Sequence, residues 1–197
     1  MHILVVRHPE TEANIRKLIY SRTESAYTER GLSSMGWMLQ KLKDKRIDAI
    51  YTSPMQRTIK LADEISAQQG CPVILSNALH EMDFGLFENM TQFEVKEKHR
   101  DHFNSYMADY SNYKIPEGES FQDVYTRLSS FIKPLLVKEG TIILVTHGMV
   151  MKAAIAYLLG IELNAVWHFN TKPATILEID YRENYGVLVE LTGPDAN

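Results

Sequence analysis

Short apolar runs of strand length alternate along the chain with longer stretches of helical periodicity. The runs at residues 3–6, 47–52, 73–75 and 141–145 predict strands, and those at 174–179 and 187–191 predict a closing hairpin. Alternating strands and helices favour a mainly parallel sheet with helices on both faces. We therefore expect an α/β protein, built as a three-layer α/β/α sandwich.

The helices between these runs have recognisable ends. Residues 32–42 are weakly helical. After the second strand, Ser53 is predicted to cap a helix that has Pro54 in its first turn and ends at Gly70. Ser120, with Asp123 three residues later, predicts the start of another helix. The apolar stretch 149–159 predicts a buried helix that stops at a glycine.

The segment between the third strand and Ser120 is more polar. Residues 91–113 are expected to form helices joined by loops, with four aromatic residues along one helical face packed against the sheet: Phe103, Tyr106, Tyr110 and Tyr113. No repeat or linker divides the chain. We expect a single domain over residues 1–197, with an elaboration at about 82–119.

Composition narrows the function classes. The 197 residues carry 21 Lys and Arg against 25 Asp and Glu, a net charge of −4, which argues against nucleic-acid binding. One cysteine, Cys71, excludes a disulfide framework. No stretch approaches 18 apolar residues, and the first residues lack the form of a signal peptide. A cytoplasmic protein without membrane contact is the expectation.

Polar residues gather where the predicted parallel strands end. These clusters are Arg7-His8, Thr52-Ser53 with Arg57 close behind, His80-Glu81, and Thr146-His147-Gly148. In an open α/β sheet, ligands bind at the carboxyl ends of the strands. Two histidines, two arginines and one glutamate are therefore expected at one edge.

This combination suits phosphoryl transfer. An imidazole is a nucleophile near neutral pH and can form a covalent intermediate. Guanidinium groups match phosphoryl oxygens through paired hydrogen bonds, and a carboxylic acid can protonate the departing alkoxide. Because arginines neutralise the charge, we expect neither a metal nor a cofactor.

At these positions the chain resembles the histidine phosphatase superfamily, the phosphoglycerate-mutase-like group. Residues 7–14 resemble its Arg-His-Gly-Glu-Thr-x-x-Asn motif, and 53–62 its Ser-x-x-x-Arg segment. Residues 81–89 resemble the acid loop, 118–120 the Gly-Glu-Ser helix start, and 145–148 the second-histidine motif. These motifs follow one another along the chain in the same order as in the family.

The resemblance implies a phosphohistidine mechanism. His8 would attack phosphorus, and Glu81 would protonate the leaving oxygen. The phosphoryl group would be held by Arg7, Arg57 and His147, with Asn14 and the backbone N–H of Gly148 as further donors and Arg22 as a looser substrate contact.

Four positions depart from the family pattern. Pro9 and Ser21 stand where the family usually has glycine, Phe87 replaces a tryptophan, and Asn89 replaces a further glycine. Proline has no backbone N–H, so residue 9 is not expected to supply a backbone hydrogen-bond donor to the site. The acid loop is expected to be shaped differently.

Hydrolysis is favoured over mutase activity because 92–119 is shorter than the insert of the glycolytic mutases. The sequence therefore predicts a metal-independent phosphomonoesterase for a small phosphorylated metabolite, with α-ribazole phosphate or a broad range of esters as substrate. Two alternatives stay open: a bisphosphate-dependent phosphoglycerate mutase, and a non-catalytic phosphate-ester binding protein. A homodimer is also left open.

Overall fold

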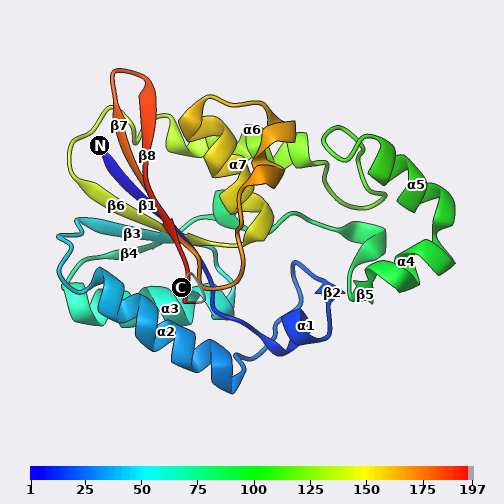
Figure 1. Cartoon of the computed structure of the whole chain (residues 1–197), viewed down its shortest axis with the longest axis horizontal. Coiled ribbons are helices and arrows are strands. Elements are labelled where there is room, and N and C mark those ends of the chain that lie inside the picture. The colour runs from blue at the N-terminus through cyan, green and yellow to red at the C-terminus, as the bar shows by residue number, and fades with distance from the viewer. Residues whose placement is uncertain (195–197) are drawn as a thin grey trace.

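A six-stranded sheet forms the centre of the computed structural model, which describes residues 1–194 (Figure 1). The strand order is β4-β3-β6-β1-β7-β8. The strands are β1 (His2–Arg7), β3 (Ala49–Thr52), β4 (Val73–Leu75), β6 (Thr141–Thr146), β7 (Ile176–Arg182) and β8 (Tyr185–Thr192). The first four are mutually parallel, whereas β7 and β8 form an antiparallel hairpin beside β1. The strands and the hairpin were predicted from the sequence.

Alternation along β1 explains the three layers. Ile3 and Val5 face one apolar cluster, while Leu4 and Val6 face the other, and all four are fully buried. Side chains of successive strand residues point to opposite faces, so a strand that is apolar at every position needs cover on both sides. This is why polar and apolar residues do not alternate from Ile3 to Val6.

Helices cover the two faces in pairs (Figure 1). On one face lie α2 (Glu29–Leu42) and α3 (Gln56–Gln69), and on the other α6 (Phe121–Ile132) and α7 (Gly148–Leu159). Shorter elements complete the chain: α1 (Glu12–Ile15), α4 (Gln92–Lys98), α5 (Arg100–Ala108) and the 3₁₀ turns η1 (Asn77–Leu79), η2 (Gly85–Phe87) and η3 (Leu163–His168). The predicted α/β/α sandwich is confirmed.

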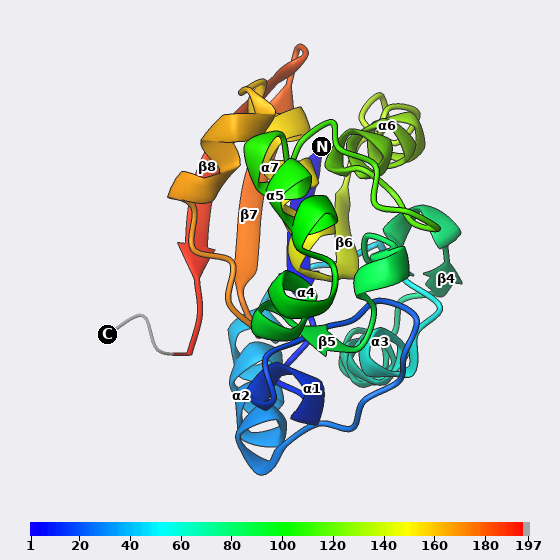
Figure 2. The same cartoon turned by 90° about the vertical axis from the view of Figure 1, so that its right-hand side faces the viewer.

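The predicted elaboration at 82–119 contains η2, α4 and α5 and the short strand β5 (Met90–Thr91), which pairs with β2 (Leu18–Ile19). Figures 1 and 2 together show α4 and α5 on the side of the sheet toward which β1 runs. The prediction of one helical face for the four aromatic residues is wrong past Ala108, where α5 ends. All four nevertheless pack against the larger core cluster. The single-domain reading stays a prediction, and residues 195–197 lie outside the described part.

The start of α3 differs from the sequence prediction. The helix begins at Gln56 with Met55 as N-cap and has no side-chain cap. The Ser53 hydroxyl lies 2.9 Å from Nε2 of His147 instead, and the Thr58 hydroxyl donates to the carbonyl of Ser53 at 2.8 Å. The predicted cap is therefore part of the loop that reaches the candidate site.

Within residues 1–194, none of the helices combines the length and apolarity that a membrane span needs.

Candidate active site

The two predicted histidines meet at the carboxyl ends of adjacent strands. Arg7 pairs with Thr146 in the parallel register of β1 and β6, so His8 and His147 follow side by side. The His8 backbone N–H donates to the Thr146 carbonyl at 3.0 Å. The two ring centroids are 5.3 Å apart. His8 is 2% exposed and His147 is 0% exposed. The sheet itself therefore positions the pair.

One hydrogen bond fixes which nitrogen of His8 is available. Its Nδ1 lies 2.7 Å from the carbonyl oxygen of Pro9. A carbonyl can only accept, so Nδ1 carries the hydrogen and Nε2 presents a lone pair. Burial, with the charges of Arg7 and Arg57, holds the pKa of His8 well below its ordinary value. Pro9 thus contributes to the site through its carbonyl oxygen, a role that is independent of the backbone N–H that proline lacks.

Arg57 enters the site from the first turn of α3 and is 3% exposed. Its terminal nitrogens donate to the carbonyls of Ser21 and Thr23 at 2.6 and 3.0 Å. That loop is held in turn by Glu88, whose Oε1 accepts the backbone N–H groups of residues 21, 22 and 23 at 2.8, 3.1 and 3.3 Å. Glu88 therefore fixes the orientation of Arg57 through the loop.

Glu81 lies at the N-terminus of α7. Its Oε2 accepts the N–H of Gly148 at 2.9 Å, and its Oε1 accepts those of Met149 at 3.2 Å and Met82 at 2.9 Å. Burial raises the pKa of this carboxyl, although these hydrogen bonds and two arginines oppose the shift. Two hydrogen bonds occupy Oε1, so the proton belongs on Oε2, whose second contact is a 3.4 Å share of the Met149 N–H.

The N–H of Gly148, predicted as a donor to the phosphoryl group, is thus directed to Glu81. The glycine has another use. A Cβ atom built there would lie 3.2 Å from Cζ of Arg7. Glycine therefore leaves room for the Arg7 guanidinium close to the first turn of α7, and Nη1 of Arg7 donates to the carbonyl of Thr171 at 2.5 Å.

Asn14 and Arg22 lie outside the cluster of buried residues that the preceding paragraphs describe. The Oδ1 atom of Asn14 accepts the backbone N–H of Thr11 at 3.0 Å and closes the capping box of α1. Arg22 is exposed, with Nε 3.7 Å from Oδ2 of Asp83. Asn89, at a position where the family has glycine, adopts a left-handed conformation with φ of 62°, which asparagine tolerates.

Sequence reasoning missed Arg127, on α6. Its guanidinium donates to both Glu119 oxygens at 2.8 and 3.1 Å and to the carbonyls of Ala78 and His80 at 2.7 and 2.8 Å. It also reaches the carbonyl of Glu81 at 3.3 Å. Arg127 thus positions the segment that carries the glutamate. No local pattern marks it, because the carbonyls that it contacts lie 46 to 49 residues away in the chain.

We expect Arg127→Met to lower the free energy of unfolding by about 2 kcal/mol, because it leaves Glu119 and several carbonyls without their donor. Urea denaturation measures the change. The matched control is Arg100→Met on α5, whose side chain is 66% exposed and which should shift stability by less than about 0.5 kcal/mol. Equal losses in both variants would contradict this role for Arg127.

Buried donors without partners mark the centre of the site. In the part of the chain that the structure describes, five buried side-chain nitrogen or oxygen atoms have no hydrogen-bond partner. Three of them are Nε of Arg7, Nε of Arg57 and Nδ1 of His147. Such atoms are rare in folded proteins and call for an explanation. A ligand rich in acceptor oxygens would satisfy all three.

Comparison with known proteins agrees with this geometry. A sequence model of the histidine phosphatase superfamily (branch 1) matches residues 3–193. The chain belongs to this superfamily. The match confirms the family predicted from the motifs, and with it the expectation that the chain is an enzyme.

Individual relatives in the superfamily carry several names. Phosphoserine phosphatase 1 of Hydrogenobacter thermophilus is 29% identical over 96% of this chain and 90% of its own length. A protein named probable phosphoglycerate mutase from Cronobacter sakazakii is 29% identical over 98% and 93%. The crystal structure of the α-ribazole phosphatase of Shigella flexneri matches with a TM-score of 0.90 and 25% identity, covering 97% of this chain and 96% of that one.

Proposed function

We propose that this histidine phosphatase hydrolyses phosphomonoesters through a phosphohistidine intermediate on His8. The observation that carries the proposal is the set of unpartnered buried donors on Arg7, Arg57 and His147, gathered beside a histidine whose Nε2 lone pair is free. Three donors suit the oxygens of a phosphoryl group, and the lone pair supplies the nucleophile.

In the first step, Nε2 of His8 forms a bond to phosphorus while the bond from phosphorus to the alcohol oxygen breaks. Glu81 gives its proton to that oxygen, so the alcohol leaves neutral. In the second step, the Glu81 carboxylate takes a proton from water as the water oxygen attacks phosphorus. The phosphorus–nitrogen bond then breaks, which releases phosphate and restores both residues.

Arg7, Arg57 and His147 stabilise the charge that develops on the phosphoryl oxygens. We assign the Ser53 hydroxyl as the donor to Nε2 of His147, 2.9 Å away, which puts the hydrogen of that ring on Nδ1, where it can be donated. Burial, with the nearby positive charges, holds the pKa of His147 well below its ordinary value, so the neutral ring is the donor. The spare amide nitrogen of Asn14 and the side chain of Arg22 are proposed as outer substrate contacts.

A release assay tests the proposal. Purified protein should liberate inorganic phosphate from alkyl and aryl monoesters, phosphoserine and α-ribazole phosphate included, at an unchanged rate in EDTA because the guanidinium groups neutralise the substrate. Activity that EDTA abolishes and a divalent metal restores would contradict the arginine-based mechanism. Bisphosphate-dependent interconversion of phosphoglycerates without net release would favour the mutase alternative.

A further inference from the structure

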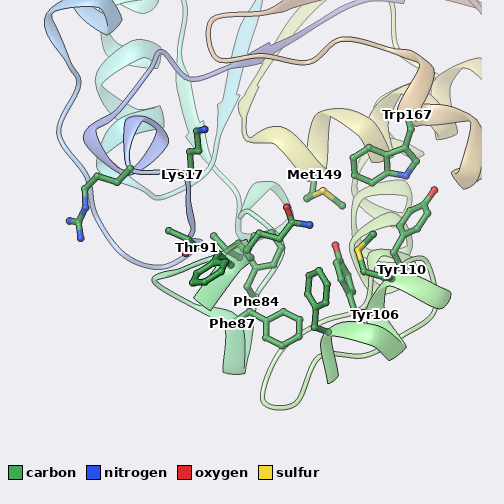
Figure 3. Close-up of a pocket in the computed structure, with 14 residues that line it drawn as sticks. Lys17, Phe84, Phe87, Thr91, Tyr106, Tyr110, Met149 and Trp167 are labelled. Atoms are coloured by element: carbon green, nitrogen blue, oxygen red, sulfur yellow. The ribbon is translucent and has the colours of Figure 1, made fainter. Parts of the chain in front are cut away.

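An apolar cavity of about 890 Å³ lies beside the acid loop (Figure 3). Half of the residues that line it are aromatic: Phe84, Phe87, Phe93, Phe103, Tyr106, Tyr110 and Trp167. Its charged lining residues are Arg16 and Lys17, and Figure 3 shows Lys17 at the end opposite Trp167. Three aromatic residues that were expected only to pack against the sheet, Phe103, Tyr106 and Tyr110, therefore also face this space.

The cavity adjoins the proposed site on two sides. Met149 lines the cavity, and its backbone N–H donates to the Glu81 carboxylate. Trp167 lines both this cavity and a smaller one of about 500 Å³ that Arg7 also borders. A substrate whose leaving oxygen lies beside Glu81 would thus direct its alcohol portion along Met149 into the aromatic space.

Several cavity side chains are unusually exposed for apolar residues. Phe93, Met107 and Trp167 are 72%, 54% and 48% exposed, and all three line the same cavity. Exposed apolar groups gathered in one concavity indicate a binding site. Trp167 is also held in place, because the Tyr110 ring meets it edge-on at 5.1 Å and the Lys152 ammonium lies 4.6 Å from its ring centroid.

We propose that this cavity binds the alcohol portion of the substrate and selects phosphomonoesters of bulky aromatic alcohols. This inference rests on the proposed hydrolysis. An aromatic group gains edge and face contacts with the aromatic rings of the cavity and buries apolar surface. The carboxylate and ammonium of phosphoserine would lose water there and find few polar partners. A three-carbon alcohol would also leave most of the volume unfilled.

Esters of primary alcohols, all of them poor leaving groups, separate this effect from chemistry. We expect kcat/KM for 2-(1-naphthyl)ethyl phosphate to exceed that for ethyl phosphate by about 50-fold, and to exceed those for phosphoserine and decyl phosphate. All four are primary alkyl esters, so binding of the alcohol portion decides the order. A preference for phosphoserine, or for the decyl ester over the naphthyl ester, would overturn the proposal.

The two tryptophans of the chain provide a matched pair of variants. Trp167→Ala should lower the ratio of the naphthylethyl to the ethyl kcat/KM by about tenfold. Trp37→Ala, on α2 and outside the cavity, should leave the ratio unchanged; its ring also has a lysine ammonium nearby, Lys41 at 5.9 Å. Phe103→Ala, on α5, should repeat the selective loss. Equal ratios in the wild-type protein, Trp167→Ala and Phe103→Ala would contradict the assignment.

Binding of an inert analogue separates this proposal from hydrolysis. By calorimetry, 3-(1-naphthyl)propylphosphonate should bind at least about tenfold more tightly than propylphosphonate, and Trp167→Ala should remove the difference. This preference would support the cavity even if no ester released phosphate, a result that contradicts the proposed hydrolysis alone. Equal binding of the two phosphonates by a protein that hydrolyses esters would overturn the cavity proposal alone.

Discussion

The His8→Ala variant is expected to lose turnover by at least about 10⁴-fold on every phosphomonoester. Removing the imidazole removes the atom that forms the bond to phosphorus, and no other nucleophile takes its place. Because Arg7, Arg57 and His147 are unchanged, inorganic phosphate should still bind with a Kd within about tenfold of the wild-type value. Phosphate release and calorimetry measure the two quantities on the same preparation.

His102→Ala is the control for this experiment. His102 is exposed on α5, where its Nδ1 contacts the Tyr113 hydroxyl, and its loss should leave turnover within about twofold. Thermal melts of both variants show whether folding is intact. A folded His8→Ala protein with more than a few per cent of the wild-type rate would disprove the assignment of the nucleophile.

Glu81→Gln is expected to have the second largest effect, and one that depends on the leaving group. For alkyl phosphates kcat/KM should fall by about 10²–10³-fold, because the departing alkoxide then lacks its proton donor. For 4-nitrophenyl phosphate the loss should stay below about tenfold, since that phenolate leaves without protonation. A uniform loss across both esters would point to a structural role for Glu81.

The pH profile gives an independent test of the same residue. The rate needs His8 neutral, so it should rise with pH through the pKa of His8, which burial lowers. It also needs Glu81 protonated, so it should fall with pH through the pKa of Glu81, which burial raises. The profile of kcat/KM should therefore be bell-shaped, and Glu81→Gln should remove the alkaline fall. Asp83→Asn, two residues away, should retain it.

The main strands were predictable because short, continuous apolar runs of this kind fold as buried strands. The run at 141–145 is mostly β-branched and is apolar from Ile142 to Val145, which is typical of a central strand covered on both faces. By contrast, β2 and β5 have two residues each and exist because they pair with one another over 70 residues of chain. Ser53 was misassigned for a related reason, since a partner distant in sequence uses its hydroxyl.

The candidate site was predictable where chemistry lies in the side chain itself. His8, Arg57 and His147 could be placed at one edge because each follows a predicted parallel strand, and because of the motif resemblance. Arg127 and Glu88 could not, because they act on backbone carbonyl and N–H groups of distant loops, which any residue type supplies. The partner of the Gly148 N–H was hidden for the same reason, as it depends on where the Glu81 loop folds back.

A trapped phosphoenzyme tests the central claim most directly. Protein quenched during turnover of a ³²P-labelled ester should carry the label on the peptide that contains His8. The bond should survive alkali and break in acid, as a phosphorus–nitrogen bond does. Label that survives acid, or that maps to a peptide without His8, would contradict the phosphohistidine mechanism.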